Sequence, residues 1–595
     1  MKIVHKLSKN FLEEEILQGE ASGNAGFLLA NKKGDYASFF DEEYSRYQGW
    51  FFRKGGNMLK MAENIELAEK EKIQEIKNEF WRITRNNKTK IGFMEESFFL
   101  PQGQRALVYE LSNPALFNLF LDFKPIYDNS EEKRFYKIEI KGKNAVIECQ
   151  NKNESVFLAI KTDSGGVSLK EQWIKRHYKL DEQRNSLPFE RYVFWALSIK
   201  AKKTVLAVSD DKKQAKKEAK YVFEKTWKLK KEKRKSIREV LEFPEIKDKK
   251  TAMAFHCCQS ALSQLVFEEN NQIHVAAGLP WFFSVYSRDE LIALKAIKGK
   301  QADVFWKIIF QQINLIGENG LLPNKINHES AQNADSIGWL FKRAGEFLET
   351  KKINEITLWK MKKQLEKTLE NLSKFSNSKE FALSFGNDTW MDTVNRAGER
   401  IEIQALRLYM LKLAYKLTED SSFKVLESSL KFKVKEKFWT GEVLLDSPND
   451  YLIRPNVFLA AYTYPELLEN AEWQTCFDNI LPALWLPWGG LATCDKNSQN
   501  FTPNHTGEIP QSYHSGDSWF YLNNLTAIVL HKVNPERYKD YIGKILEGSR
   551  KEILFMGAVS CHAEVSSASE LKSQGAWSQA WSNALFIELI KELKL

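Results

Sequence analysis

The chain has 595 residues, which is more than one hydrophobic core normally supports, so the sequence predicts at least two domains. Hydrophobic residues make up 43% of the chain and charged residues 28%, which is typical of soluble globular proteins. The net charge of +9 comes mainly from dispersed lysines, which indicates a solvated surface and argues against a nucleic-acid-binding protein.

The cysteines and the apolar runs give a prediction of the compartment. Six cysteines, including the adjacent pair Cys257 and Cys258, form neither a disulfide framework nor a CxxC metal pattern. The first residues lack an apolar run of signal-peptide length, and no later run is long enough to span a membrane. We therefore expect a cytoplasmic protein with no membrane partner.

Residues 1–210 are expected to form an antiparallel β-sandwich domain. Short runs of alternating apolar residues recur at 136–140, 156–160, 192–199 and 204–208, separated by Gly, Asn, Asp and Ser turns. An aromatic segment at 44–51 is interpreted as another hairpin of the sandwich.

Residues 211–247 differ in composition, since they are rich in Lys and contain few turn residues. Tyr221, Phe223, Trp227 and Leu229 lie loosely along one side of the predicted helix, which suggests a charged linker helix. A nucleic-acid-binding arm is the alternative, but the interspersed glutamates argue against it.

From residue 248 to 595 the sequence predicts helices joined by alternating short and long connections. The amphipathic segments lie near 251–269, 288–298, 301–317, 333–349, 354–376, 401–418, 421–436, 454–469, 472–481, 517–533, 536–550 and 576–593. Short connections join antiparallel helix pairs, so all long loops should emerge at one end of the bundle. Twelve helices in such pairs predict an all-α (α/α)6 barrel, with six long loops building one pocket.

The third long loop carries a carboxylate beside an aromatic residue. Trp390 and Asp392 precede a helix that begins close to Glu402. An aromatic ring can pack on the C–H face of a sugar while a carboxylate meets its hydroxyls or its glycosidic oxygen. The alternative is an ordinary solvated loop followed by a capped helix.

The first long loop shows a related pattern. Trp281 and its neighbouring phenylalanines are followed by Arg288 and Asp289, a combination that suits a pyranose ring and its hydroxyls. Packing of the rings and capping of the next helix by Asp289 are the alternatives. The other long loops supply Asp335, His514, Trp519, Glu564 and Glu570.

Several segments together resemble one enzyme family. PWFFSVYSRD, TWMD, GERIEIQAL, IRPN, YHSGDSW and QAWS are similar, in this order, to segments of the glucosidase half of glycogen debranching enzymes. This is the amylo-α-1,6-glucosidase family, which is more distantly related to glucoamylases. SRYQGWFF near the N-terminus resembles a run in the accessory β-domain of the family.

The resemblance implies an inverting exo-glucosidase that releases glucose from α-1,6 branch stubs of glycogen or related α-glucans. Asp392 matches the general acid, and the general base lies upstream of QAWS. Glu564 fits the family spacing better than Glu570, which remains the alternative base. Asp517 departs from the pattern of eukaryotic members, and its place before a helix predicts a capping role.

The resemblance and the loop chemistry also predict the sugar-binding residues. They are Trp281, Arg288, Asp289, Asp335, Trp390, Glu402, His514 and Trp519, each with a packing or capping alternative. His514 has no Cys or second His at ligand spacing, and no phosphate-binding loop occurs, so we expect neither a metal nor a cofactor.

Two other functions stay open at this level. The chain could be another α-glucosidase on the same barrel, such as a glucoamylase or a trehalase, or a non-catalytic glucan-binding protein. Retention of Asp392 together with Glu564 argues against a binding protein, which needs no base. Residues 1–210 do not alternate between strands and helices, so no glucanotransferase barrel is expected there. The oligomeric state cannot be predicted.

Overall fold

The computed structural model describes residues 1–8, 13–41, 44–90, 92–130, 134–152, 154–164, 166–297, 302–326, 331–349, 354–375 and 381–595. The chain divides into two compact units. The first comprises Met1–Asn271, Leu279–Phe283 and Lys551–His562, and the second comprises Gln272–Gly278, Ser284–Arg550 and Ala563–Leu595. This division differs from the predicted boundaries after residues 210 and 247, because 211–271 belong with the N-terminal strands.

Among the described residues, the first unit is built on one sheet of sixteen strands. The strands are β1 (Lys2–Ser8), β2 (Glu14–Glu20), β3 (Ala25–Ala30), β4 (Tyr36–Phe40), β5 (Gly49–Lys54), β6 (Asn57–Leu67), β7 (Lys70–Asn78), β8 (Ile83–Thr89), β9 (Gly92–Phe99), β10 (Ala106–Pro125), β11 (Arg134–Lys141), β12 (Asn144–Asn151), β13 (Glu154–Thr162), β14 (Gly166–His177), β15 (Glu190–Ser209) and β26 (Gly557–Ala558). Most neighbours are antiparallel, as predicted, whereas β1 with β7 and β3 with β26 are parallel.

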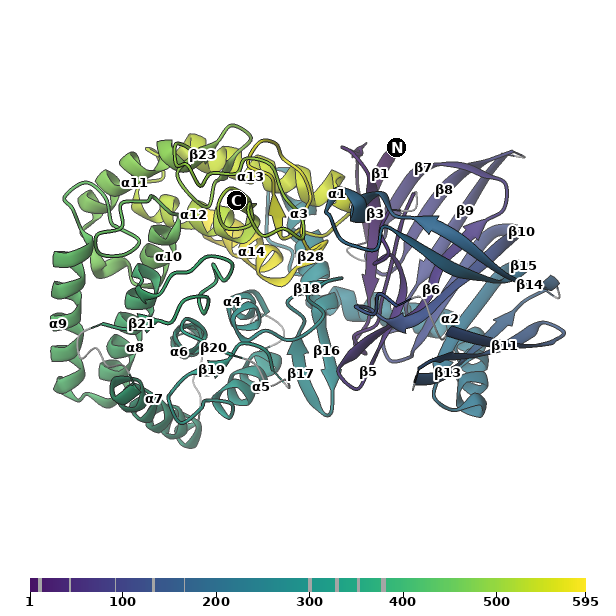
Figure 1. Cartoon of the computed structure of the whole chain (residues 1–595), viewed down its shortest axis with the longest axis horizontal. Coiled ribbons are helices and arrows are strands. Elements are labelled where there is room, and N and C mark those ends of the chain that lie inside the picture. The colour runs from purple at the N-terminus through teal and green to yellow at the C-terminus, as the bar shows by residue number, and fades with distance from the viewer. Residues whose placement is uncertain are drawn as a thin grey trace. The chain divides into compact units, whose positions relative to one another are not determined.

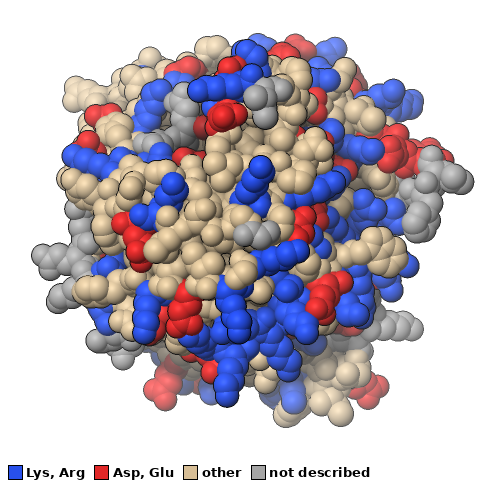
Figure 2. Space-filling view, turned by 90° about the vertical axis from the view of Figure 1, so that its right-hand side faces the viewer, with Lys and Arg blue, Asp and Glu red and all other residues tan. Residues whose placement is uncertain are grey.

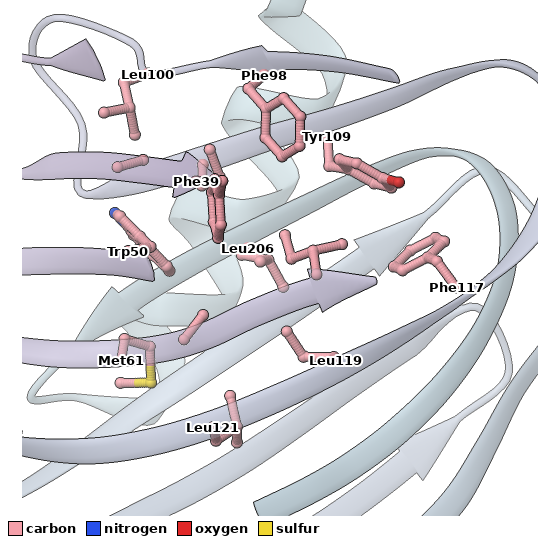
Figure 3. Packing of buried hydrophobic residues seen from close by; sticks show 14 of the residues in the cluster. Phe39, Trp50, Met61, Phe98, Leu100, Tyr109, Phe117, Leu119, Leu121 and Leu206 are labelled. Atoms are coloured by element: carbon pink, nitrogen blue, oxygen red, sulfur yellow. The ribbon is translucent and has the colours of Figure 1, made fainter. Parts of the chain in front are cut away.

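The predicted sandwich is in fact a continuous hydrogen-bonded sheet. The two longest strands, β10 and β15, connect the other strands into this sheet. Strand β10 pairs with β6, β9 and β15, and β15 pairs with β10, β13 and β14. Bulges in β10 allow these long strands to bend. Side chains from β4, β9 and β10 meet in one core. There the rings of Phe39, Phe98, Tyr109 and Phe117 contact one another in this order (Figure 3).

The predicted linker helix packs on this sheet. Helix α2 (Lys212–Val240) contacts β13, β15 and β10, and its buried side includes Ala215, Ala219 and Val222 at helical spacing. Of the residues named along one side of this helix, Leu229 is buried and Trp227 is 76% exposed. Many lysines of α2 are exposed, and Figure 2 shows Lys and Arg side chains gathered on the lower part of one face.

The remaining helices include all twelve that were predicted. Short α1 spans Lys179–Gln183, and the others are α3 (Lys249–Leu265), α4 (Ser287–Ile297), α5 (Ala302–Ile313), α6 (Ser336–Leu348), α7 (Glu355–Phe375), α8 (Ile401–Thr418), α9 (Ser421–Phe438), α10 (Asn456–Thr463), the 3-10 helix η1 (Pro465–Leu467), α11 (Asn470–Leu484), α12 (Phe520–Val533), α13 (Lys539–Phe555) and α14 (Ala580–Leu593). Helix α3 contacts α2, β2 and β3, which explains why it belongs to the first unit.

Six helices of the second unit pack in a closed cycle. Helix α4 contacts α6, α6 contacts α8, and the sequence of contacts continues through α10, α12 and α14 back to α4 (Figure 1). Every residue of α10 is buried, whereas α9 buries only Leu430, Val434 and Phe438. Helices buried on all sides lie at the centre of a bundle, so this burial separates an inner ring from outer helices.

Short strands accompany the loops between the helices. They are β16 (Val266–Glu269), β17 (Gln272–Val275), β18 (Gly278–Leu279), β19 (Leu322–Pro323), β20 (Gln332–Asn333), β21 (Leu383–Ser384), β22 (Gly398–Glu399), β23 (Trp485–Leu486), β24 (Gly490–Leu491), β25 (Ser518–Trp519), β27 (Val565–Ser566) and β28 (Ser578–Gln579). Parts of two predicted long loops, 327–330 and 376–380, lie outside the described residues. No helix among the described residues is long and apolar enough to cross a membrane.

Candidate active site

Arg288 and Asp335 connect the loops that precede α4 and α6. Arg288 Nε lies 2.7 Å from Asp335 Oδ2 in a buried ion pair. Arg288 Nη2 also donates to the carbonyl oxygen of Asp388, 3.3 Å away in the loop before α8. Burial acts to lower the pKa of Arg288, but the carboxylates of Asp335 and Asp392 raise it above its ordinary value. Arg288 is therefore a fixed cation beside Asp392.

Asp289 connects the first loop to the last one. It lies in the first turn of α4, and its Oδ1 accepts a hydrogen bond of 2.9 Å from Gln579 Nε2, so its carboxylate is held by another loop as well as by its helix position. A Cβ at residue 278 would lie 1.9 Å from Gln579 Oε1, so Gly278 makes room for this contact. Burial, with the negative charges of Glu564 and Asp392, raises the pKa of Asp289 to about 7.

Trp390 is part of an aromatic cluster behind Asp392. Its side chain is 2% exposed, and its Nε1 donates to Asn456 Oδ1 at 2.7 Å. Its ring meets the rings of His514, Trp519 and Tyr521 edge to face, with centroids 5.4 to 5.5 Å apart. These contacts fix Trp390, so it acts through packing rather than as an open platform for a sugar.

His514 and Trp519 belong to the same cluster. Their rings are stacked with centroids 5.1 Å apart, and Trp519 Nε1 donates to the carbonyl oxygen of Tyr513 at 2.8 Å. His514 Nδ1 lies 2.7 Å from Thr393 Oγ1, which joins the loops before α8 and α12. Burial, together with the charges of nearby arginines that include Arg454, lowers the pKa of His514 well below its ordinary value. His514 is therefore a neutral connecting residue.

Glu402 is engaged in a buried network rather than facing an open space. Its two carboxylate oxygens accept from Arg396 Nη1 and Nη2 at 2.5 and 3.0 Å. Arg396 also pairs with Asp446 at 2.7 Å, and Asp446 accepts from Asn456 at 2.5 Å. Because Asn456 holds Trp390, this geometry favours a positioning role for Glu402 over the sugar contact predicted for it.

Asp392 presents an accessible carboxylate. Its side chain is exposed, and the backbone of its residue is fixed by Asn387, whose Nδ2 donates to the Asp392 carbonyl oxygen at 2.7 Å. Among the described residues, no other side chain pairs with its carboxylate. Crowding by surrounding protein atoms, with the charge of Asp335, raises the pKa of Asp392, while Arg288 acts in the opposite direction. A carboxyl group that is accessible and has a raised pKa is suited to act as a proton donor.

Glu564 differs from Asp392, because its side chain is buried and its carboxylate accepts two hydrogen bonds. The hydroxyl of Tyr513 donates to its Oε1, and the N–H of Ala576 donates to its Oε2 at 2.9 Å. A Cβ at Gly575, whose φ is +66°, would lie 2.3 Å from Glu564 Oε2, so this approach requires glycine. Donors to the carboxylate favour its ionised form, which a general base needs.

Asp392 and Glu564 face the same tyrosines. Burial and the charges of Asp289, Asp392 and Glu564 raise the pKa of Tyr286 to about 12. Burial, Glu564 and then Asp392 also raise the pKa of Tyr513 well above its ordinary value. The two carboxylates therefore belong to one site, although no hydrogen bond joins them among the described residues.

Glu570 and Asp517 are the two other acidic residues that were considered from the sequence. Glu570 is exposed and pairs with Lys572 at 2.5 Å, as expected for a carboxylate at a rim. Asp517 is fully buried and accepts from His505 Nδ1 at 2.7 Å and from Ser512 Oγ at 2.9 Å. The capping role predicted for Asp517 is wrong, because α12 begins at Phe520 without a side-chain cap.

Trp281 belongs to the first unit, whereas the site residues described so far belong to the second. Its ring packs against Tyr47 with centroids 5.3 Å apart, and the guanidinium of Arg184 lies 3.9 Å from its ring centre. Its carbonyl oxygen accepts from the hydroxyl of Tyr127. These contacts match the packing alternative for Trp281.

The structure thus brings seven of the eight predicted sugar-binding residues and both catalytic candidates into one unit. Contacts between different loops connect these residues in three groups. Arg288 pairs with Asp335, and Asp289 accepts a hydrogen bond from Gln579. Trp390 contacts Asn456 and Trp519, Trp519 bonds to Tyr513, and Tyr513 bonds to Glu564. Tyr513, Arg396 and Asn456 were missed as site residues. Tyr513 precedes His514 within YHSGDSW, and Asn456 ends IRPN, so the motifs themselves could have identified both residues.

Among the described residues, no group of three or more His, Cys, Asp or Glu side chains could hold a metal ion.

The family model of the amylo-α-1,6-glucosidases matches residues 259–588, which is more than half of the chain. The chain belongs to this family. The match includes both catalytic candidates, and membership makes the chain a glycoside hydrolase of the α-glucan type. A bacterial glucoamylase complexed with acarbose has a similar structure, with a TM-score of 0.63 over 96% of this chain and 95% of that chain. At 11% identity, this likeness shows a glucoamylase-like fold alone. A comparison with curated proteins found no match.

Proposed function

We propose that the chain is an inverting exo-glucosidase that releases glucose from α-1,6-linked branch stubs of glycogen or related α-glucans. The observation that carries this proposal is the pairing of unlike carboxyl groups. Asp392 is open and harder to ionise, whereas Glu564 accepts hydrogen bonds from Tyr513 and Ala576. Opposite environments for two acids in one site are typical of an acid and base pair.

In the proposed reaction, Asp392 donates its proton to the glycosidic oxygen as the bond to C1 breaks. Glu564 takes a proton from a water molecule, which attacks C1 from the opposite face and inverts its configuration. This arrangement needs roughly 6.5–9.5 Å between the two carboxyl groups, so that the water fits between them. Each carboxyl group begins the reaction in the protonation state that its surroundings favour.

The sugar at the end of the chain would be bound by Arg288, Asp289 and Asp335. Asp289 and Arg288 are adjacent on α4 and offer an acceptor and donors to neighbouring hydroxyls. Trp390, Trp519, His514 and Glu402 position this group through the aromatic cluster and the Arg396 network. The closed cycle of inner helices supports an (α/α)6 barrel as the scaffold that holds these loops.

We further propose that the N-terminal unit carries no glucanotransferase barrel, because its described residues form a sheet without alternating strands and helices. The six cysteines are buried free thiols, which supports the cytoplasm as the site of action.

The test is glucose release from isomaltose, from maltose and from a limit dextrin whose branches have been trimmed to single α-1,6-linked glucose residues, by the wild type and by the Asp392→Asn and Glu564→Gln variants. The proposal predicts release from α-1,6 ends that both substitutions abolish. Release from maltose alone would indicate an α-1,4-specific glucosidase of the same fold. No release from any substrate would indicate a glucan-binding protein.

A further inference from the structure

The second unit contains a separate cavity between helices α7, α8 and α9. Its volume is about 670 Å³, which falls within the usual range of small-molecule sites, about 300–1,000 Å³. The walls are mainly apolar and include Leu369, Leu372, Phe381, Leu411, Phe423 and Leu430. No residue of the candidate active site lines it, so this cavity needs its own explanation.

Two cationic residues, Arg407 of α8 and Lys433 of α9, line this cavity, and Arg407 is the one without a partner among the described residues. Arg407 of α8 lines the large cavity and also a neighbouring one of about 40 Å³. Among the described residues, the Arg407 guanidinium has no hydrogen bond and no ion pair. Burial lowers the pKa of Arg407 to about 10, so it is still charged at neutral pH. A crowded cation without a partner costs free energy unless a bound anion compensates it.

The acidic residues of the cavity wall do not supply that compensation. Glu366 pairs with Lys363 at 3.1 Å, and Glu370 pairs with Lys374 at 2.5 Å. Asp420 caps α9 and accepts from the N–H of Ser422 at 2.9 Å. Each of these carboxylates is engaged away from Arg407, which leaves the guanidinium as the group that a ligand would meet.

We propose that this cavity binds an amphipathic monocarboxylate, with its carboxylate on Arg407 and its apolar body against the leucine and phenylalanine walls. The planar guanidinium offers two parallel donors that match a carboxylate. The acidic residues Glu366, Glu370 and Asp420 in the wall disfavour a doubly charged phosphate. The leucine and phenylalanine side chains favour a ligand with a long apolar body over a sugar.

The cavity also borders the loop that carries Asp392. Ala382 lines both cavities, and its N–H and carbonyl oxygen bond to the Oε1 and Nε2 of Gln404 on α8, at 3.0 and 2.7 Å. The chain continues from Ala382 into β21, which pairs with β22, and the loop between these strands contains Asp392. The wall of the cavity therefore includes the residue that precedes the loop of the proposed acid.

Calorimetric titration of the full chain with decanoate tests this site directly. The proposal predicts binding to the wild type, and binding at least about tenfold weaker to Arg407→Gln, since a hydrogen-bonded charge pair is lost. Ser429→Trp, which fills the cavity from an exposed wall position, should also abolish binding. The matched control Arg537→Gln removes an exposed arginine that pairs with Asp478 elsewhere and should bind decanoate like the wild type.

Decanol and decyl phosphate test the head group. The proposal predicts that decanol binds at least about tenfold more weakly than decanoate, because it carries no charge. Equal binding of decanoate by the wild type and Arg407→Gln, or no binding by the wild type, would overturn the proposal. Tighter binding of decyl phosphate than of decanoate would overturn the choice of a carboxylate. None of these results depends on glucosidase activity.

Discussion

Replacing Tyr513 with phenylalanine removes the hydroxyl that donates to Glu564 and keeps the ring. The ring packs against Trp519 and His514, with centroids 4.7 and 4.8 Å away, so the aromatic cluster should stay intact. Glu564 then retains the N–H of Ala576 as a donor. The substitution therefore isolates one hydrogen bond to the proposed base.

The expected size of the effect follows from that bond. A hydrogen bond to a charged group contributes about 1.5–3 kcal/mol, and about 1.4 kcal/mol corresponds to a factor of ten. The bond favours the ionised carboxylate, so its loss makes the base harder to ionise. We expect the acidic limb of the kcat/KM profile of Tyr513→Phe to move up by about 1–2 pH units.

The assay is the pH dependence of kcat/KM for glucose release by the wild type, Tyr513→Phe and Tyr521→Phe. Tyr521 is a control in the same cluster, because its hydroxyl has no partner among the described residues. Its substitution should leave the position of the acidic limb unchanged. If the limb also stays in place in Tyr513→Phe, the hydroxyl does not stabilise the base and the reasoning is refuted.

Further predictions concern the other acids. Glu564→Gln should lower kcat by at least about a hundredfold, while Glu570→Gln stays near wild type; the reverse result in a glucose assay would make Glu570 the base. Glu402→Gln should lower the free energy of unfolding by about 3–5 kcal/mol in denaturant titrations, because it leaves Arg396 and Asp446 in an incomplete buried network; an unchanged stability with a raised KM would instead indicate a direct sugar contact. Asp289 has a raised pKa, so its contribution to stability is present below about pH 4 and is lost as the pH rises through about 7. Asp289→Asn should therefore gain stability relative to the wild type between pH 4 and pH 8, by up to about 4 kcal/mol, and an equal difference at both pH values would contradict this.

The sequence allowed prediction of the helices and of the main carboxylates for physical reasons. The helices from α3 to α14 keep the apolar spacing that periodicity detects, so all twelve were found. Asp392 lies in one of the short motifs whose order along the chain identified the family, and Glu564 was found by its spacing from another. Roles that depend on a distant partner were not visible, since Glu402 is engaged by Arg396 and Asp517 by His505 only in the folded chain.

The side of α2 that packs on the sheet is formed by residues with small side chains. Helix α2 faces the sheet with Ala215, Ala219 and Val222, whereas the conspicuous Trp227 faces solvent. The side of this helix that packs on the sheet could not be identified from its aromatic residues, because small residues allow the close packing. For Trp281, an aromatic residue near an Arg–Asp pair suggested a sugar contact, yet its ring packs against Tyr47 and Arg184.

The anomeric form of the first glucose released tests the central proposal most directly. Proton nuclear magnetic resonance can record it from a limit dextrin before mutarotation mixes the anomers. A water molecule activated by Glu564 across the ring from Asp392 predicts β-glucose as the initial product. Initial release of α-glucose would show retention and would contradict the roles proposed for both residues.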